Sequence, residues 1–194
     1  MMPYLLPLAA YLFGSISTAV VVAKAMGLQD PRQVGSGNPG ATNILRYGGK
    51  LAAIVTLVGD ILKGVIPVAV ARLLTDDPMI LAATVFMAFI GHLFPVFFGF
   101  KGGKGVATAL GVWFALNPWI GLALMATWLV TAIVFRYSSL SALAASVAAP
   151  FYVAWLSPGL PYVVVMSSMS GFLIFRHRSN IRNLLAGTET KIGR

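Results

Sequence analysis

Residues 35–46 read G-S-G-N-P-G-A-T-N-I-L-R, a run of glycines and small polar side chains that ends in a cation. Glycine allows positive φ and lets backbone N–H groups come close to a ligand. We expect Ser36 or Asn38 to cap a helix that has Pro39 at its first position. The N–H groups at a helix start attract anions, and the Arg46 guanidinium suits a phosphate. The stretch therefore predicts a phosphate-binding loop.

The same stretch contains the pattern G-x-G-x-x-G at Gly35, Gly37 and Gly40. A dinucleotide-binding fingerprint needs a preceding strand and a βαβ unit, and the sequence predicts neither. A plain glycine-rich turn between membrane helices remains an alternative. The Ser, Thr, Asn and Arg side chains exceed what such a turn requires, which favours the binding loop.

A second glycine-rich stretch, residues 91–108, reads G-H-L-F-P-V-F-F-G-F-K-G-G-K-G-V-A-T. Here Lys101 and Lys104 stand among glycines, and flexible N–H groups beside ammonium groups suit phosphate. The stretch is not a nucleotide P-loop, because Gly105 occupies the position of the required hydroxyl residue. Two alternatives stay open: the lysines reflect only the positive charge of cytoplasmic loops, and His92 is a packed, hydrogen-bonded residue.

A third polar stretch, residues 176–189, reads R-H-R-S-N-I-R-N-L-L-A-G-T-E. On a helix, His177, Asn180 and Leu184 share one face. Such a helix aims one imidazole and one amide in the same direction. The alternative is a basic amphipathic helix that lies on lipid headgroups.

The composition predicts an all-α, polytopic integral membrane protein with a single domain over residues 1–194. Of the 194 residues, 58% are hydrophobic and 10% are charged, against about 25% charged in soluble domains. Lipid cannot satisfy open backbone groups, and the alternation of a β-barrel is absent. Several of the seven apolar segments are shorter than the ~20 residues that cross a bilayer, so five spans remain possible if the fourth and fifth segments form a re-entrant pair. The segments are 3–24, 51–73, 79–98, 105–117, 118–135, 140–156 and 161–175.

The charges predict the orientation in the membrane. With seven spans, twelve of the 14 Lys and Arg residues fall on one side, and Arg72 with Asp76 and Asp77 on the other. The positive-inside rule then places the N-terminus outside and the C-terminus, with all three stretches, in the cytoplasm. We expect no nucleic-acid partner, because the cations lie in short loops between apolar segments. Pro95 is expected to kink or end the third helix.

Asp60 and Lys63 fall inside the second apolar segment, three residues apart. On a helix they lie on one face and can pair. Charges within a membrane are costly and often mark a functional interior. A structural ion pair and a direct role in substrate binding both remain open. With no cysteine, two histidines and five acids, we expect no metal site and no cofactor.

Together the three stretches resemble the three signature motifs of the bacterial acyl-phosphate-dependent glycerol-3-phosphate acyltransferases, the PlsY family. The resemblance covers essentially the whole chain, including the spacing between motifs. It implies a seven-helix inner-membrane enzyme that moves a fatty acyl group from acyl phosphate to the 1-hydroxyl of glycerol 3-phosphate. The products are lysophosphatidic acid and phosphate, in the first acylation of phospholipid biosynthesis. The chain is not similar to acyl-CoA-dependent enzymes with a His-x4-Asp motif, because no aspartate follows His92 at that spacing.

The resemblance implies roles residue by residue. The implied catalytic residues are Ser36, Arg46, Lys104, His177 and Asn180. The implied substrate- and phosphate-binding residues are Gly37, Asn38, Thr42, Asn43, His92, Lys101, Gly102, Gly103, Gly105 and Thr108. Glu189 matches the third motif. The implied partners are acyl phosphate, glycerol 3-phosphate and membrane lipids, and docking of an acyl-phosphate-forming enzyme at the cytoplasmic face stays open.

Acyl phosphate has a good leaving group, so we expect the hydroxyl of glycerol 3-phosphate to attack it directly. Arg46, Lys104 and glycine N–H groups are expected to hold the phosphates. Ser36 and Asn180 are expected to orient polar groups near the reacting carbonyl. Neutral His177 is a candidate base. The alternatives are proton transfer to the donor's own phosphate and an acylated Ser36.

Two other classes of protein compete with this interpretation. A transporter for a phosphorylated metabolite also points broken helices at an anion, but it usually does so at the membrane midplane between internal repeats. The sequence shows no such repeat. A phosphatidyl-alcohol synthase needs an acid-rich metal motif, and the five scattered acids do not supply one.

Overall fold

The computed structural model describes residues 2–193, which in that range form helices and connecting loops without strands. The all-α prediction is therefore confirmed. The chain divides into two compact units, Met1–Leu116 and Asn117–Arg194. The prediction of one domain over residues 1–194 stays a prediction.

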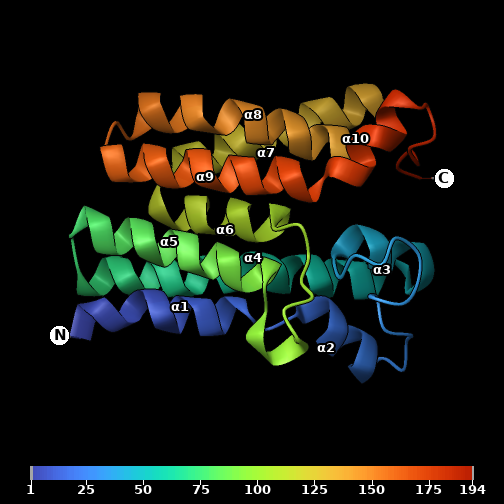
Figure 1. Ribbon diagram of the computed structural model, residues 1–194, viewed down its shortest axis with the longest axis horizontal. Coiled ribbons are helices and arrows are strands. Elements are labelled where there is room, and N and C mark those ends of the chain that lie inside the picture. Colours follow the sequence, from blue (N-terminus) through green and yellow to red (C-terminus); the bar gives the residue numbers. More distant parts are fainter. Residues whose placement is uncertain (1, 194) are drawn as a thin grey trace. The chain divides into compact units, whose positions relative to one another are not determined.

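In the first unit, α1, α4, α5 and α6 run side by side, and α2 and α3 lie toward the end away from the N-terminus (Figure 1). Both α3 and α6 pack against α4, and α5 packs against α1. The elements are η1 (Met2–Leu5), α1 (Leu6–Gly14), α2 (Thr18–Ala25), α3 (Ala41–Tyr47), α4 (Gly49–Leu74), α5 (Pro78–Leu93), η2 (Val96–Phe98) and α6 (Val106–Leu116).

Glycines let α4 and α6 approach closely. A Cβ on Gly64 would collide with the backbone oxygen of Thr108, and one on Gly111 with that of Ile61. Small residues at such crossings are typical of helices packed in membranes. The close approach places Thr108 of α6 directly beside the middle of α4.

The first apolar segment is one candidate span, Pro3–Ala25, but its helix is interrupted. Helix α1 ends at Gly14 and α2 begins at Thr18. A break in the helical hydrogen-bond pattern leaves carbonyl groups that need other partners. The Lys63 ammonium supplies one, donating to the Ile16 oxygen at 2.9 Å. A charged residue of α4 thus stabilises the break.

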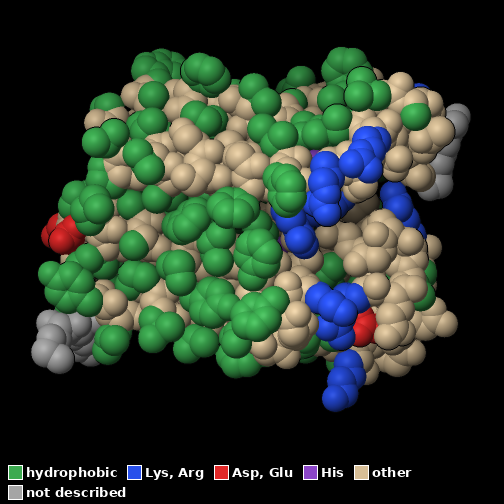
Figure 2. Space-filling view, viewed as in Figure 1, with side chains coloured by type: hydrophobic (Ala, Val, Ile, Leu, Met, Phe, Trp, Pro, Cys, Tyr) green, Lys and Arg blue, Asp and Glu red, His purple; other side chains and the backbone are tan. Residues whose placement is uncertain are grey.

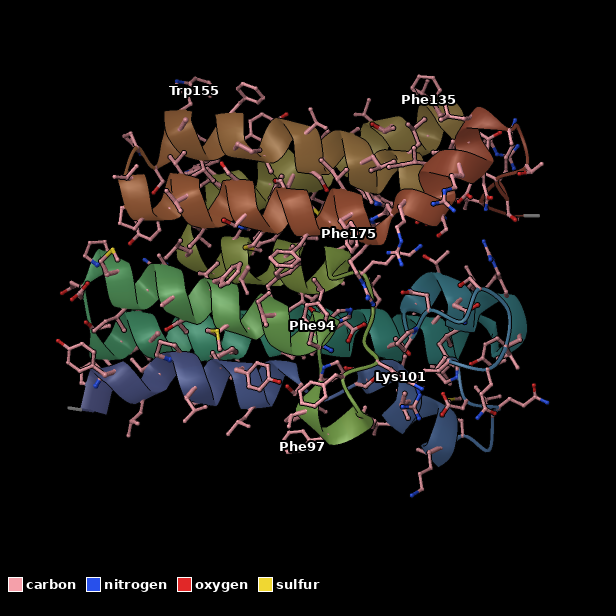
Figure 3. The ribbon with its side chains drawn as sticks, in the orientation of Figure 1. Phe94, Phe97, Lys101, Phe135, Trp155 and Phe175 are labelled. Atoms are coloured by element: carbon pink, nitrogen blue, oxygen red, sulfur yellow. The ribbon has the colours of Figure 1, made fainter. Side chains whose placement is uncertain are left out.

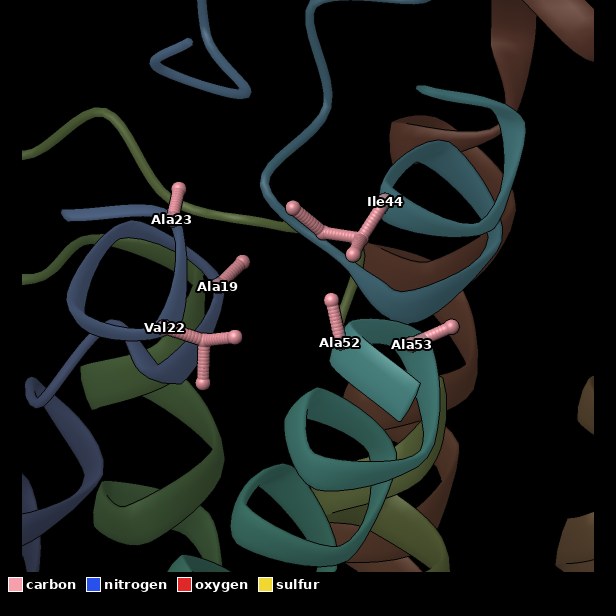
Figure 4. Packing of buried hydrophobic residues seen from close by; sticks show 6 residues of the cluster. All are labelled: Ala19, Val22, Ala23, Ile44, Ala52 and Ala53. Atoms are coloured by element: carbon pink, nitrogen blue, oxygen red, sulfur yellow. The ribbon is translucent and has the colours of Figure 1, made fainter. Parts of the chain in front are cut away.

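A small apolar cluster fixes α3 against α2 and α4 (Figure 4). Ile44 of α3 is fully buried in it, and the partly buried Leu28 and Tyr47 pack against its edge. Most other members are alanines, so the three helices come close together. The cluster consists of Ala19, Val22, Ala23, Ile44, Ala52 and Ala53.

In the second unit, α8 packs against both α7 and α9. A hydroxyl–hydroxyl hydrogen bond of 2.8 Å joins Thr127 of α7 to Tyr152 of α8. Phe135 and Trp155 lie toward opposite ends of this unit, and α10 lies at the Phe135 end (Figure 3). The elements are α7 (Pro118–Phe135), α8 (Ser138–Leu156), α9 (Leu160–Arg176) and α10 (Arg178–Leu185).

Five segments are long and apolar enough to cross a membrane, and α6 and α9 are shorter apolar helices, all within the described residues. In each unit, hydrophobic side chains are spread over the visible face between backbone and other side chains, and Lys and Arg gather toward one end (Figure 2). The prediction for Pro95 is confirmed, because α5 ends at Leu93. The five segments are Pro3–Ala25, Gly49–Leu74, Pro78–Phe98, Pro118–Phe135 and Ser138–Leu156.

Candidate functional site

The first stretch forms a loop followed by a short helix. Helix α3 begins at Ala41, and its N-cap is Gly40 in an extended conformation. The predicted cap at Ser36 or Asn38, with Pro39 at the first helical position, is therefore wrong. The Gly40 oxygen accepts the first helical hydrogen bonds, so the loop is longer than the sequence suggested. Since α3 has only seven residues, its dipole is small, and the predicted phosphate binding would depend mainly on the loop itself.

Asn43 holds this loop from the inside. Its side chain is buried, with an exposed fraction of 1%. Its Oδ1 accepts from the Ser36 N–H at 2.9 Å. Its Nδ2 donates to the oxygens of Pro31 and Val34 at 2.9 and 3.0 Å. These bonds use both amide hydrogens, so Asn43 shapes the loop, and direct contact with substrate stays a prediction.

Around this internal anchor, polar side chains of the first stretch face outward. Ser36, Thr42 and Arg46 are exposed, and Asn38 is half-buried. The Arg46 guanidinium makes no hydrogen bond or ion pair with any residue from 2 to 193. Gly37 has φ of +67°, the left-handed conformation that glycine was expected to provide. The outward surface can therefore accept an anion without first breaking an internal ion pair.

The second stretch leaves α5 at Leu93 and reaches α6 at Val106 through a turn and an extended glycine-rich run. Lys101 is exposed, and Figure 3 shows it on the connection between α5 and α6. Lys104 is half-buried, and Gly102, Gly103 and Gly105 are buried. The run therefore enters the protein interior between its two lysines.

The two stretches meet at Gly103. A Cβ on Gly103 would lie 3.1 Å from the Pro39 oxygen and would collide with Nε2 of His92. A second link joins the loops nearby, where Arg32 donates to the Phe98 oxygen at 3.2 Å. The first and second motifs are thus brought together within one unit, as the phosphate-binding hypothesis requires.

Arg32 also forms an ion pair with Asp30, with 2.6 Å between Nη2 and Oδ2. The hydrogen bond from Arg32 holds the pKa of the Asp30 carboxyl below its usual value and raises the pKa of the guanidinium. The sequence alone indicated no specific role for either residue. In the sequence, an acidic and a basic residue two positions apart could have indicated this ion pair, but such a spacing is common and does not by itself predict one.

His92 and Thr108, both expected to bind substrate, lie in the interior. Their exposed fractions are 6% and 0%. Nδ1 of His92 lies 3.1 Å from Oγ1 of Thr108, which donates to the Asp60 backbone oxygen at 2.9 Å. His92 is therefore a packed residue in contact with another side chain, as one of the two interpretations expected.

Asp60 and Lys63 form the expected ion pair, with 2.8 Å between Oδ1 and Nζ. Both side chains are buried, and the Lys63 ammonium also donates a hydrogen bond to the Ile16 oxygen. Burial costs an ion several kcal/mol unless it is paired and hydrogen-bonded, and here the two charges compensate each other. The geometry favours the structural ion pair over direct substrate binding.

The third stretch belongs to the second unit and forms α10 directly after α9. The predicted helix forms over Arg178–Leu185, but His177, which was expected on its face, is its N-cap and lies buried at the junction. Its Nδ1 lies 2.8 Å from the Leu173 oxygen, which can only accept, so Nδ1 carries the proton. Asn180 donates to Glu189 at 2.7 Å, and Ser139 donates to the same Glu189 oxygen. Glu189 thus fixes the Asn180 amide, and convergence of this stretch with the other two stays a prediction.

Comparison with known proteins points to one family. The model of the family described as glycerol-3-phosphate acyltransferase matches residues 4–187. A glycerol-3-phosphate acyltransferase of Thioalkalivibrio sulfidiphilus is 55% identical over 97% of this chain and 93% of its own. Another, of Thiobacillus denitrificans, is 54% identical over 100% of this chain and 99% of its own length.

Solved structures give the same result. The crystal structure of PlsY (YgiH), an integral membrane glycerol 3-phosphate acyltransferase, in its glycerol 3-phosphate form is 40% identical, with a TM-score of 0.95. The match covers 100% of this chain and 96% of that one. The lysophosphatidic acid form of that enzyme matches with a TM-score of 0.92 at 39% identity.

Proposed function

We propose the following reaction for this chain, which belongs to the glycerol-3-phosphate acyltransferase family: a fatty acyl group moves from acyl phosphate to the 1-hydroxyl of glycerol 3-phosphate. The products are lysophosphatidic acid and inorganic phosphate. The chain is an acyltransferase and a multi-pass membrane protein, and phospholipid biosynthesis follows from the family. The choice of acyl phosphate as donor is supported by the three motifs and by the absence of a His-x4-Asp pair.

One observation carries the location of the site. Gly103 of the second stretch packs against the Pro39 oxygen of the first, so the two loops with predicted phosphate-binding groups lie side by side. Both substrates are anionic and repel each other in water. Fixed N–H groups and cations that neutralise both phosphates lower the free energy of bringing them together. We assign phosphate binding to Arg46, Lys104 and the N–H groups of these loops.

The reaction needs no covalent enzyme intermediate. The 1-hydroxyl oxygen forms the new ester bond to the acyl carbon, the bond from that carbon to the phosphate oxygen breaks, and phosphate leaves. The hydroxyl proton goes to a base. Ser36 and Asn180 orient polar groups near the reacting carbonyl.

His177 is the side chain best suited to be that base. Since Nδ1 donates to the Leu173 oxygen, Nε2 is the accepting nitrogen of the neutral ring. The leaving phosphate as base, with His177 in binding, is the second candidate. Acylation of Ser36 is a third, and a mass-spectrometric search for acyl-Ser36 after a rapid quench tests it.

For the membrane we propose seven spans with the N-terminus outside and the site on the cytoplasmic face of the inner membrane. The geometry of α6 supports this count. Arg72, near the end of α4, donates to the Ala115 oxygen near the end of α6 at 2.7 Å. Thr108, near the start of α6, contacts Asp60 in the middle of α4. Thus α6 runs parallel to the second half of α4, and it is short because the glycine-rich run enters the interior before it begins.

An activity assay in detergent tests the proposal. Purified protein should release phosphate from acyl phosphate only when glycerol 3-phosphate is present, and lysophosphatidic acid should appear in equal amount. Acyl-CoA should not replace acyl phosphate. Use of acyl-CoA alone would overturn the proposed donor, and a phosphate-metabolite transporter would give neither product.

A further inference from the structure

We propose that a buried chain of contacts from Asp60 through Thr108 to His92 positions the glycine-rich run at the acyl-transfer site. Asp60, Thr108 and His92 are then positioning residues that act through Gly102 and Gly103, and do not touch substrate themselves. The inference rests on the proposed role of the second stretch in phosphate binding. It assigns a role to the intramembrane charge of α4.

The donors and acceptors in this chain of contacts allow one arrangement. A threonine hydroxyl has one hydrogen, and that of Thr108 is donated to the Asp60 backbone oxygen at 2.9 Å. At 3.1 Å from His92, Oγ1 of Thr108 can therefore only accept. Nδ1 of His92 must carry a proton, and the Asp60 carboxylate at 3.6 Å favours it electrostatically.

The opposite edge of the His92 ring supports the glycine-rich run. Any side chain at Gly103 would collide with Nε2 of His92, and any at Gly102 with the backbone oxygens of His92 and Leu93. The Gly103 N–H donates to the His92 oxygen at 3.2 Å. Ring and backbone of His92 thus form the surface on which the run lies. The ring orientation therefore determines how closely Gly103 approaches Pro39.

Lys63 anchors the other end of this chain of contacts. It pairs with the Asp60 carboxylate at 2.8 Å and donates to Ile16 in the break between α1 and α2. Because Lys63 and Asp60 are 4% and 3% exposed, neither is presented to an aqueous substrate. Lys63 instead links Asp60 to the break between α1 and α2, and the Asp60 backbone oxygen links it to Thr108 of α6. Helices α4, α5 and α6, the break between α1 and α2, and the glycine-rich run are therefore connected through one buried polar network.

Thr108→Val tests the chain of contacts, because it removes the hydroxyl and keeps the shape. Thr84→Val is the matched control: Thr84 is also fully buried in the first unit, but among residues 2–193 its hydroxyl bonds only to Ile80 of its own helix. Thr108→Ser restores the hydroxyl. We expect Thr108→Val to raise the KM for at least one anionic substrate about five- to tenfold, the factor for one neutral hydrogen bond. We expect a much smaller change in kcat, and wild-type KM values for Thr84→Val and Thr108→Ser.

A spectroscopic measurement tests the proton position without any substrate. The chain has two histidines, so ¹⁵N NMR of a ring-labelled His177→Gln variant reports on His92 alone. Nδ1 should carry a proton, and adding Thr108→Val should shift the proton population toward Nε2. An unprotonated Nδ1, or KM values unchanged by Thr108→Val, would overturn the inference. If wild-type protein does not use acyl phosphate, the proposed donor fails, while the NMR result still decides the proton position.

Discussion

The side-chain oxygen of Asn43 lies 2.9 Å from the backbone nitrogen of Ser36 and accepts its hydrogen bond. The Asn43 amide, at the third position of α3, also donates two hydrogen bonds from Nδ2 to backbone oxygens of the loop. These three bonds take the place of backbone–backbone hydrogen bonds. Such local side-chain bonds let a loop keep one conformation without secondary structure. The exposed groups of the loop are therefore positioned before a ligand arrives.

Asn43→Asp should disrupt this loop. The substitution keeps the shape but turns a donor into an acceptor that faces the oxygens of Pro31 and Val34. We expect a loss of at least about 2 kcal/mol in stability, because buried polar groups lose their partners, together with most of the activity. Thermal unfolding and activity in detergent measure both. Gln33→Glu adds the same charge at an exposed position of the same loop and should be close to wild type; an equally stable Asn43→Asp protein would contradict the anchoring role.

Arg46→Ala should nearly abolish activity in a protein that still folds. The guanidinium is exposed and has no ion-pair partner among residues 2–193, so its removal costs little stability. Loss of a charge that stabilises reacting phosphates typically lowers the rate by about 10²–10³-fold. Lys50→Ala, which removes another exposed cation nearby, is the control. An active Arg46→Ala enzyme with unchanged KM values would refute the phosphate assignment.

The sequence predicted the apolar helices and the motifs well because hydrophobicity and glycine patterns are local. It predicted the end of α5 before Pro95 and the helix after Arg176. It did not predict the break between α1 and α2, because Lys63, which stabilises it, lies 47 positions from Ile16. The helix start at Gly40 was missed for a related reason. The Asn43 side chain holds the loop open, and sequence patterns alone do not reveal that bond.

The same limit applies to the candidate site. Composition and spacing identified Asp60 and Lys63 as a pair, and the structure forms it. The contacts of His92 with Thr108 and Gly103 lie within the second stretch, but they depend on how the chain turns between α5 and α6, which no sequence pattern indicates. Substrate roles for such buried residues follow from motif resemblance alone, which does not separate binding from positioning.

Lys63→Met should be more harmful than removing both charges. The single change leaves the Asp60 carboxylate buried without its ion-pair partner, a loss that typically costs about 3–5 kcal/mol. The double variant Asp60→Asn/Lys63→Met has no unpaired charge and should recover much of that stability. Thermal inactivation in detergent compares the two. Equal destabilisation would mean that the charges do not compensate each other in the folded protein.

Asp30 should add a small acid-sensitive contribution to stability. Its pKa is held below the usual 3.8, chiefly by the Arg32 hydrogen bond. A lowered folded-state pKa stabilises the protein above the unfolded pKa, and this contribution is lost as pH falls through the folded one. Below about pH 4, the melting temperature of the wild-type protein should therefore fall more than that of Asp30→Asn, because the variant has no carboxylate to protonate at this position. The carboxyl is partly exposed, so salt should weaken the effect. Asp76→Asn, which removes an exposed acid elsewhere in the first unit, is the control.

His177→Gln separates the two candidate bases. If Nε2 of His177 takes the hydroxyl proton, the variant should lose about 10²–10⁴-fold in kcat with little change in KM. Glutamine keeps an uncharged polar group of similar length in place of the ring, so the junction between α9 and α10 should fold. If the leaving phosphate is the base, the variant should mainly raise a KM. The rate in the variant should then keep its dependence on pH, whereas loss of a histidine-like limb in the pH profile of kcat/KM would support His177 as the base.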